Sequence, residues 1–217
     1  NTTAGFSIAT FTTLGSTIST VGHGLGVIPD MVIVKTRANS NGWFVYHKDV
    51  GNNKFLRLET TGAETTNAMW NDTTPTSSVF SINANNLGAS TSVAYCFADV
   101  QGFSKMGSYT GNGNNDGTFV YTGFSPSFVL YKDSTSVSDW VMKDNRRPGF
   151  NVTDDVLYPN LADAEGSGAD IDFLSNGFKA RTTAANTNKS NAGFIYMAFA
   201  ENPFVATSGT SAIPVTA

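Results

Sequence analysis

The sequence predicts an all-β chain built from two tandem homologous β-sandwich repeats of jelly-roll-like character. Two observations lead to this fold class. Two blocks of the chain repeat each other at a constant offset of 97 residues, and helical periodicity is absent from every full 11-residue window. The repeated landmarks pair Pro29 with Pro126, Lys35 with Lys132 and Trp43 with Trp140. We therefore expect a first repeat over residues 1–102 and a second over residues 103–217, which includes a C-terminal tail.

Later landmarks keep their order while the offset drifts by a few residues. The offset is 101 for Leu56 and Leu157, 98 for Phe80 and Phe178, and 102 for Phe97 and Phe199. Such drifts indicate loops that change length between conserved core elements. The join near residues 100–107 carries Phe103 and Met106, which favours a packed connection over a flexible linker.

Short apolar runs between turn residues predict the strands in order. In the first block they follow two weaker segments, 10–12 and 16–20, and comprise 31–34, 43–47, 56–58, 79–82 and 93–97. In the second block 119–121, 128–131 and 140–143 repeat the pattern, and 111–117 reads as a Gly/Asn loop. The best helical candidate is the segment 158–165, of one or two turns. Trp43 and Trp140, repeated on apolar strands, are interpreted as core residues.

Composition excludes several classes of function. The net charge is −4 and the 13 Lys and Arg residues form no basic stripe, so we expect no nucleic-acid partner. No apolar run approaches 18 residues, so we expect no membrane insertion, and we also expect no signal peptide. Cys96 stands alone in an apolar run and is interpreted as a small buried hydrophobic residue. Because the chain starts at Asn1, we expect it to be a piece of a longer protein.

No pattern of residues predicts an enzyme, a metal centre or a cofactor. His47 with Asp99 could support general-base chemistry, but His47 aligns with Asp144 in the second block, so the repeat does not keep a base. Glu64 and Glu165 are repeat-equivalent, which indicates one structural role performed twice. Calcium binding stays open at two groups of carboxylates: Asp116 in its loop, and Asp154, Asp155, Asp163, Asp170 and Asp172.

Two segments are candidates for ligand binding. Trp70, Asn71 and Asp72 combine an aromatic ring with polar side chains in a loop, which is typical of a sugar platform, and the repeat does not preserve the tryptophan. Arg146 and Arg147 lie in an insertion of four residues relative to the first block, where recognition loops are common. The alternative for the arginines is a solvated basic turn.

Several longer motifs resemble an uncharacterised domain family of tailed bacteriophages, especially marine ones, found in virion and tail-fibre-like proteins. They cover nearly the whole chain: His23-Gly24-Leu25-Gly26-Val27-Ile28-Pro29-Asp30, Tyr46-His47-Lys48, Trp70-Asn71-Asp72-Thr73-Thr74-Pro75, Gly107-Ser108-Tyr109-Thr110-Gly111 and Tyr196-Met197-Ala198-Phe199-Ala200-Glu201-Asn202-Pro203. The segment Lys143-Asp144-Asn145-Arg146-Arg147 departs from the family pattern. The resemblance implies a setting and supplies no catalytic residue.

From the resemblance we expect a non-enzymatic structural domain of a virion, in a fibre, spike or decoration protein, that serves assembly or host-surface attachment. It also implies a homo-oligomer, often a trimer, in contact with other virion proteins. The ring-bearing segments at Phe103, Phe150 and Phe204 could supply the contact surface, or could pin the linker and tail to their own blocks. The alternative function is a lectin-like carbohydrate-binding module that binds a bacterial surface glycan.

Overall fold

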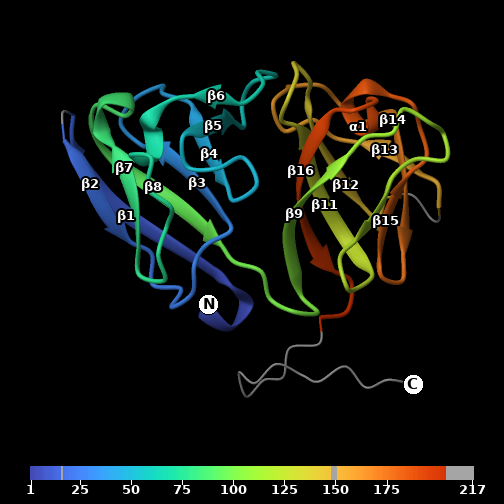
Figure 1. Cartoon of the computed structure of the whole chain (residues 1–217), viewed down its shortest axis with the longest axis horizontal. Coiled ribbons are helices and arrows are strands. Elements are labelled where there is room, and N and C mark those ends of the chain that lie inside the picture. Colours follow the sequence, from blue (N-terminus) through green and yellow to red (C-terminus); the bar gives the residue numbers. More distant parts are fainter. Residues whose placement is uncertain (16, 148–150, 204–217) are drawn as a thin grey trace. The chain divides into compact units, whose positions relative to one another are not determined.

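The computed structural model describes residues 1–15, 17–147 and 151–203, and it confirms the all-β fold class. The chain divides into two compact units, Asn1–Asp99 (unit 1) and Val100–Ala217 (unit 2). This division lies three residues before the boundary of 102/103 expected from the sequence. Figure 1 shows the strands of both units, coloured from blue to red along the chain.

Unit 1 contains two antiparallel sheets. The larger sheet has six strands in the order β1 (Phe6–Leu14), β8 (Ala89–Phe97), β3 (Met31–Thr36), β4 (Trp43–His47), β5 (Lys54–Arg57) and β6 (Thr65–Thr66). The smaller sheet pairs β2 (Ile18–Gly22) with β7 (Val79–Asn83). The described residues of unit 1 also form three short 3-10 helices: η1 (Thr2–Ala4), η2 (Ala68–Trp70) and η3 (Ala84–Asn86).

The core of unit 1 lies between these two sheets. Alternation along each strand directs every second side chain inward, so Val32, Val34 and Ala94 of the large sheet face Phe80 and Ile82 of the small one. Cys96 belongs to the same cluster and is fully buried. Burial raises the pKa of its thiol to about 12, so it remains protonated and packs as a small hydrophobic side chain.

Unit 2 contains two four-stranded antiparallel sheets. The first has the order β12 (Trp140–Asp144), β11 (Pro126–Asp133), β16 (Gly193–Ala200) and β9 (Ser104–Thr110). The second has the order β10 (Phe119–Tyr121), β15 (Gly177–Ala180), β14 (Gly166–Leu174) and β13 (Thr153–Val156). A single helical turn, α1 (Ala185–Asn188), precedes β16.

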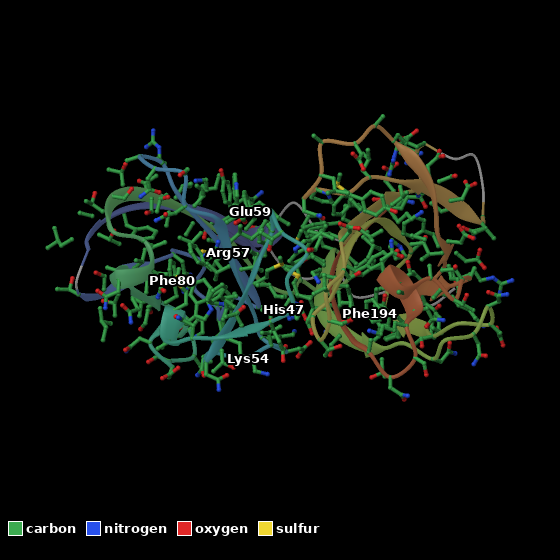
Figure 2. All side chains as sticks on the ribbon, turned by 90° about the horizontal axis from the view of Figure 1, so that it is seen from above. His47, Lys54, Arg57, Glu59, Phe80 and Phe194 are labelled. Carbon is green, nitrogen blue, oxygen red and sulfur yellow. The ribbon has the colours of Figure 1, made fainter. Side chains whose placement is uncertain are left out.

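Aromatic rings dominate the core of unit 2. Tyr109 stacks on Phe194 with ring centroids 4.7 Å apart, and Phe178 meets Tyr196 edge to face at 5.4 Å. Phe194 in this core and Phe80 in the core of unit 1 are 0 and 1% exposed, and each lies inside its own unit (Figure 2). Such offset and edge-to-face pairs stabilise a core beyond the area that they bury.

The two units share a strand order and a pairing register. The run β1–β8–β3–β4 in unit 1 corresponds to β9–β16–β11–β12 in unit 2, and the pair β2–β7 corresponds to β10–β15. Met31 pairs with His47 in β3–β4, and Phe128 pairs with Asp144 in β11–β12. Both partners of the second pair lie 97 residues after those of the first. The offset read from the sequence is therefore also the offset of the pairing.

The two repeated tryptophans lie on the side of their sheets opposite the main cores. Trp43 pairs with Lys35, whereas the neighbouring pair, Val34 with Phe44, faces the core of unit 1. Trp43 is half-buried and stacks on Tyr95 at 6.3 Å, so the expectation of a core position is wrong for this residue. Trp140 is 1% exposed, as expected for a buried residue.

Two further expectations can be compared with the structure. The segment 158–165 forms turns and extended chain, so the predicted helix is wrong there, and the only α-helical turn of the described residues is α1. Phe103 packs edge to face on Phe199 at 5.8 Å, which pins the start of unit 2 to its own sheet. Phe150 and Phe204 lie outside the described residues.

Candidate functional site

The tryptophan of the first predicted binding segment belongs to the core of unit 1. Trp70 ends the 3-10 helix η2 and is 2% exposed. Its indole N–H donates to the carbonyl of Lys54 at 2.9 Å, and its ring meets Tyr46 edge to face at 5.7 Å. The prediction of a sugar platform at Trp70 is wrong, because a ring buried on both faces offers no surface to a ligand.

The two residues after Trp70 form the turn that ends η2. Asn71 and Asp72 adopt left-handed backbone conformations, with φ of 55° and 47°, a region that Asn and Asp tolerate well. The carbonyl of Asn71 accepts a hydrogen bond from the Thr73 hydroxyl at 2.7 Å. Asp72 is exposed, but the aromatic partner that suggested a binding role is turned into the core. This part of the predicted site is therefore a surface turn.

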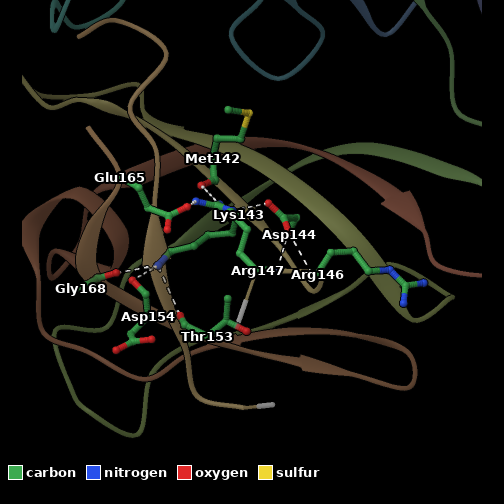
Figure 3. A network of polar contacts seen from close by, with 9 residues as sticks. All are labelled: Met142, Lys143, Asp144, Arg146, Arg147, Thr153, Asp154, Glu165 and Gly168. Atoms are coloured by element: carbon green, nitrogen blue, oxygen red, sulfur yellow. Dashed lines mark hydrogen bonds and ion pairs between the residues drawn. The ribbon is translucent and has the colours of Figure 1, made fainter. Parts of the chain in front are cut away.

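The two arginines of the second predicted segment differ: Arg147 is held by ion pairs, and Arg146 is exposed (Figure 3). Arg147 donates from Nε to Asp144 and from Nη1 to Glu165, each at 2.6 Å, and its guanidinium also reaches the carbonyl of Met142. Arg146 leaves 76% of its side chain exposed and approaches Glu201 at 3.5 Å. Arg147 therefore holds the loop together, and Arg146 is the member of the pair that faces solvent.

Next to this loop, a buried lysine lies against an irregularity between β13 and β14. Lys143 is fully buried, and its ammonium donates to the carbonyls of Gly168 (2.6 Å), Asp154 (2.9 Å) and Thr153 (3.3 Å), as Figure 3 shows. The register of β13 and β14 shifts between Thr153 and Asp155, and at this irregularity Asp154 and Gly168 have no pairing partner across the two strands. Burial lowers the pKa of Lys143 to about 8, and the nearby carboxylate of Asp170 opposes the shift.

The remaining candidates from the sequence are explained by local structure. His47 is 1% exposed, and its Nδ1 accepts from the backbone N–H of Asp49 at 3.2 Å. Glu64 pairs with Lys54 and Glu165 pairs with Arg147, so each glutamate binds a cation of its own unit. Among the described residues, no group of three or more His, Cys, Asp or Glu side chains is arranged to hold a metal ion.

The strongest candidate surface is the outer face of the sheet β10–β15–β14–β13, which we call the β10 face. The inner side chains of this sheet, such as Val120, Phe178 and Ala169, belong to the core of unit 2. Side chains alternate along a strand, so their neighbours point to the opposite face. The residues of the β10 face are Phe119, Tyr121, Val152, Asp154, Asp170, Asp172, Leu174, Gly177, Lys179 and Arg181.

Two aromatic rings stand at one end of the β10 face. Phe119 is 44% exposed and Tyr121 is 65% exposed, although both occupy a regular strand. Tyr121 pairs with Gly177 on the neighbouring strand, where a Cβ atom would collide with the Val120 carbonyl and lie 3.1 Å from the Phe119 ring. A glycine is therefore required at this position, because any larger residue would collide with the Val120 backbone and crowd the Phe119 ring.

Charged pairs border the two rings. Lys179, which pairs with Phe119 across the strands, binds the carboxylate of Asp116 at 2.5 Å. This hydrogen bond lowers the pKa of Asp116, so the carboxylate is charged at neutral pH. Arg181 binds Asp172 at 3.3 Å on the same face. Hydrogen-bond donors and acceptors therefore lie next to exposed aromatic surface.

The other end of the β10 face contains a hollow of about 430 Å³. Its lining residues are Val152, Asp154, Ser167, Gly168 and Asp170. The carbonyls of Asp154 and Gly168 are the ones that bind the Lys143 ammonium, so the buried lysine fixes the wall of this hollow from behind. The size falls within the range of sites that accept small ligands or one sugar unit.

Sequence reasoning assigned the segment 119–121 to a strand and gave it no function. Its three residues read as one apolar run, and only the alternation within a strand separates Val120, which is buried, from the two exposed rings. A comparison of the repeats could have found the pair, because the register places Thr20 and Gly22 at the corresponding positions of β2. Neither residue carries an aromatic ring.

The chain belongs to a family defined as a domain of unknown function, DUF7483, whose match covers residues 1–203. No curated protein and no solved structure matches it. No helix among the described residues is both long enough and apolar enough to cross a membrane.

Proposed function

We propose that this chain is a non-enzymatic domain of a bacteriophage virion that attaches to a bacterial surface glycan through the β10 face. The observation that carries the proposal is the exposed pair Phe119 and Tyr121 on a regular strand. Large rings on a strand normally turn inward, and exposed ones mark a contact surface. The lectin-like activity is in this view the means by which the virion domain attaches.

The chemistry of the β10 face suits a saccharide. Ring faces stack on the apolar faces of sugar rings, and charged or amide groups bond the hydroxyls at their edges. Phe119 and Tyr121 supply the rings, and the pairs Lys179–Asp116 and Arg181–Asp172 supply acceptors and donors. A sugar chain that runs along the face from the rings would reach the hollow beside Asp170.

The comparison of the two units supports a role in binding over a role in folding. We propose that both are copies of one jelly-roll-like sandwich, a view supported by their common strand order and register. Unit 1 has Thr20 and Gly22 at the positions of Phe119 and Tyr121. A copy that folds without these rings indicates that the architecture does not need them.

The proposed setting is the virion particle, in a fibre, spike or decoration protein, as the resemblance to phage proteins implies. Other virion proteins and further copies of the chain would be its assembly partners, and no cofactor takes part. A domain that only assembles, without binding a glycan, is the competing function. Its prediction differs, because substitutions on the β10 face would then leave attachment to cells unchanged.

Binding to purified surface polysaccharide of a susceptible bacterium tests the proposal. We expect Phe119→Ala and Tyr121→Ala each to weaken binding roughly tenfold, which corresponds to about 1.4 kcal/mol. The matched control is Ile18→Ala, which removes an exposed apolar side chain from β2, the unit 1 counterpart of β10. Isothermal titration calorimetry with circular dichroism of each variant separates lost binding from lost fold.

Two results would overturn the proposal. If both ring variants bound polysaccharide and cells as tightly as the native chain, the β10 face would not be the attachment site. If incubation with the polysaccharide released new reducing ends at a steady rate, the domain would be an enzyme.

A further inference from the structure

The open edge of the large sheet in unit 1 is unprotected. Strand β1 is the terminal strand of that sheet and runs over nine residues, and within the described part of the chain it pairs only with β8. Natural proteins usually protect such an edge with charges, a proline or a short strand. Residues 6–14 contain neither a charged residue nor a proline, and the first charged side chain of the sequence is Asp30.

The pairing of β1 defines which backbone groups point outward. The carbonyl of Gly5 accepts from the N–H of Ala98, so the odd-numbered residues of β1 bond to β8 and the even-numbered ones face the edge. Phe6 exchanges its two edge bonds with Asn1. The edge groups of Ile8, Thr10, Thr12 and Leu14 then remain, and the described part of the chain supplies no partner to them.

The corresponding edge of unit 2 is different. Strand β9 has seven residues, and it carries a charged residue, Lys105. Its ends are occupied, because the Ser104 carbonyl accepts from the N–H of Val100 and the Thr110 carbonyl accepts from the Thr118 hydroxyl. The long, neutral, open edge is therefore a feature of unit 1 alone, and the shared fold does not require it.

We propose that β1 pairs with β1 of a second copy of this chain, antiparallel and around a two-fold axis at Phe11. In this register Ile8 lies opposite Leu14 of the partner copy, and Thr10 lies opposite Thr12. The four free residues of each strand then exchange hydrogen bonds, and the two six-stranded sheets become one sheet of twelve strands.

Complementarity identifies the partner as a second copy. A neutral strand meets itself without repulsion, and the two-fold axis places apolar residues opposite apolar ones and threonines opposite threonines, pairs that stabilise antiparallel sheets. Ile8 and Leu14 are 57 and 76% exposed, so both gain from a neighbour. Phe11 is half-buried against Phe80 at the rim of the core, and its symmetry mate would complete that rim.

The oligomeric state of the 217-residue chain at tens of micromolar tests this pairing. Analytical ultracentrifugation should give a dimer for the native chain and a monomer for Thr10→Lys/Thr12→Lys, which places like charges across the new strand pair. The matched control is Thr91→Lys, because Thr91 is exposed on β8 and pairs with Thr12, yet lies one strand away from the edge. The control should remain a dimer.

A cysteine pair tests the register independently of affinity. Residues opposite each other in a hydrogen-bonded antiparallel pair have Cα atoms about 5.5 Å apart, within the range of a disulfide. Thr10→Cys/Thr12→Cys should therefore give a covalent dimer on oxidation, whereas Cys96 is buried. The proposal is overturned by a native monomer or trimer, by a dimer that survives the edge lysines, by a control that dissociates equally, or by the absence of the cross-link. None of these results bears on glycan binding at the β10 face.

Discussion

Each unit has its own core, and the two cores are built alike, whereas the surfaces of the units differ. Their strand orders and pairing offsets agree, and equivalent positions such as Phe80 and Phe178 are buried to the same 1%. Their smaller sheets differ, because β2 pairs with β7 alone, whereas β10 and β15 continue into β14 and β13. Unit 2 adds the aromatic pair and the hollow to this sheet, and unit 1 keeps the open edge.

The comparison separates what the architecture requires from what it permits. A feature present in both units, such as a lysine that folds back over the loop after its strand, has a structural explanation: Lys35 donates to the Asn41 carbonyl, and Lys132 donates to the Ser136 carbonyl. A feature present in one unit only needs another explanation. By this criterion the β10 face and the β1 edge are the surfaces where function is to be sought.

The largest expected effects test the core positions that correspond in the two units. Phe80→Ala and Phe178→Ala each empty a fully buried ring position, and we expect each to cost about 3–5 kcal/mol of unfolding free energy. Denaturant unfolding followed by circular dichroism measures both. Unequal costs, such as a loss below 1 kcal/mol in one unit only, would break the structural equivalence of the two positions.

The repeated tryptophans should give unequal effects. Trp140 is 1% exposed, so Trp140→Ala should cost on the order of 3–5 kcal/mol. Trp43 is half-buried and stacks on Tyr95, so Trp43→Ala should cost less, about 1–2 kcal/mol. Thermal midpoints of the two variants rank them. A larger loss at Trp43 would show that sequence equivalence, and not exposure, governs the cost.

Alkaline pH should stabilise unit 2 over a defined window. Burial lowers the pKa of Lys132 and of Lys143 to about 8, whereas an unfolded lysine keeps its proton up to about pH 10.4. Between these two pH values the unfolded chain binds more protons than the folded chain. The free energy of unfolding therefore rises with pH, by about 1–2 kcal/mol for each lysine. Above pH 10 the trend reverses, because burial raises the pKa of Tyr109 and Tyr131.

Urea midpoints from pH 7 to 11 measure this window. Lys132→Met removes one of the two groups, so the rise between pH 8 and 10 should become smaller. Unit 1 offers the contrast, since Lys48 is a third exposed and its contacts with Asp30 and Asp99 outweigh burial and raise its pKa. A native midpoint that falls steadily from pH 8 would contradict the buried, weakly basic state of both lysines.

The sequence predicted the fold class and the offset between two strand pairs. The all-β class is confirmed, and the offset of 97 residues recurs in the pairing of β3–β4 and β11–β12. The prediction at Trp70 was wrong because residue type alone does not show which way the ring points. An indole beside Asn and Asp in a turn resembles a binding platform, but here its N–H donates to the Lys54 carbonyl inside the core. Phe119 and Tyr121 were missed because the orientation of a three-residue strand depends on its partner, β15.

The smallest expected effects concern the loop inserted in unit 2. Arg147 bonds two carboxylates and is one-fifth exposed, so Arg147→Ala should cost about 1 kcal/mol, near the upper end for surface ion pairs. Arg146 is 76% exposed, so Arg146→Ala should change stability by less than about 0.5 kcal/mol.

Hydrogen bonds from both arginines outweigh burial and lower the pKa of Asp144. The stability cost of Arg147→Ala should therefore shrink as the pH falls below 4 and Asp144 becomes protonated. Chemical denaturation of both variants at pH 7 and pH 3.5 measures this. If Arg146→Ala were the more damaging change, the exposed arginine would be holding the loop, and the division between a structural and a solvent-facing arginine would be wrong.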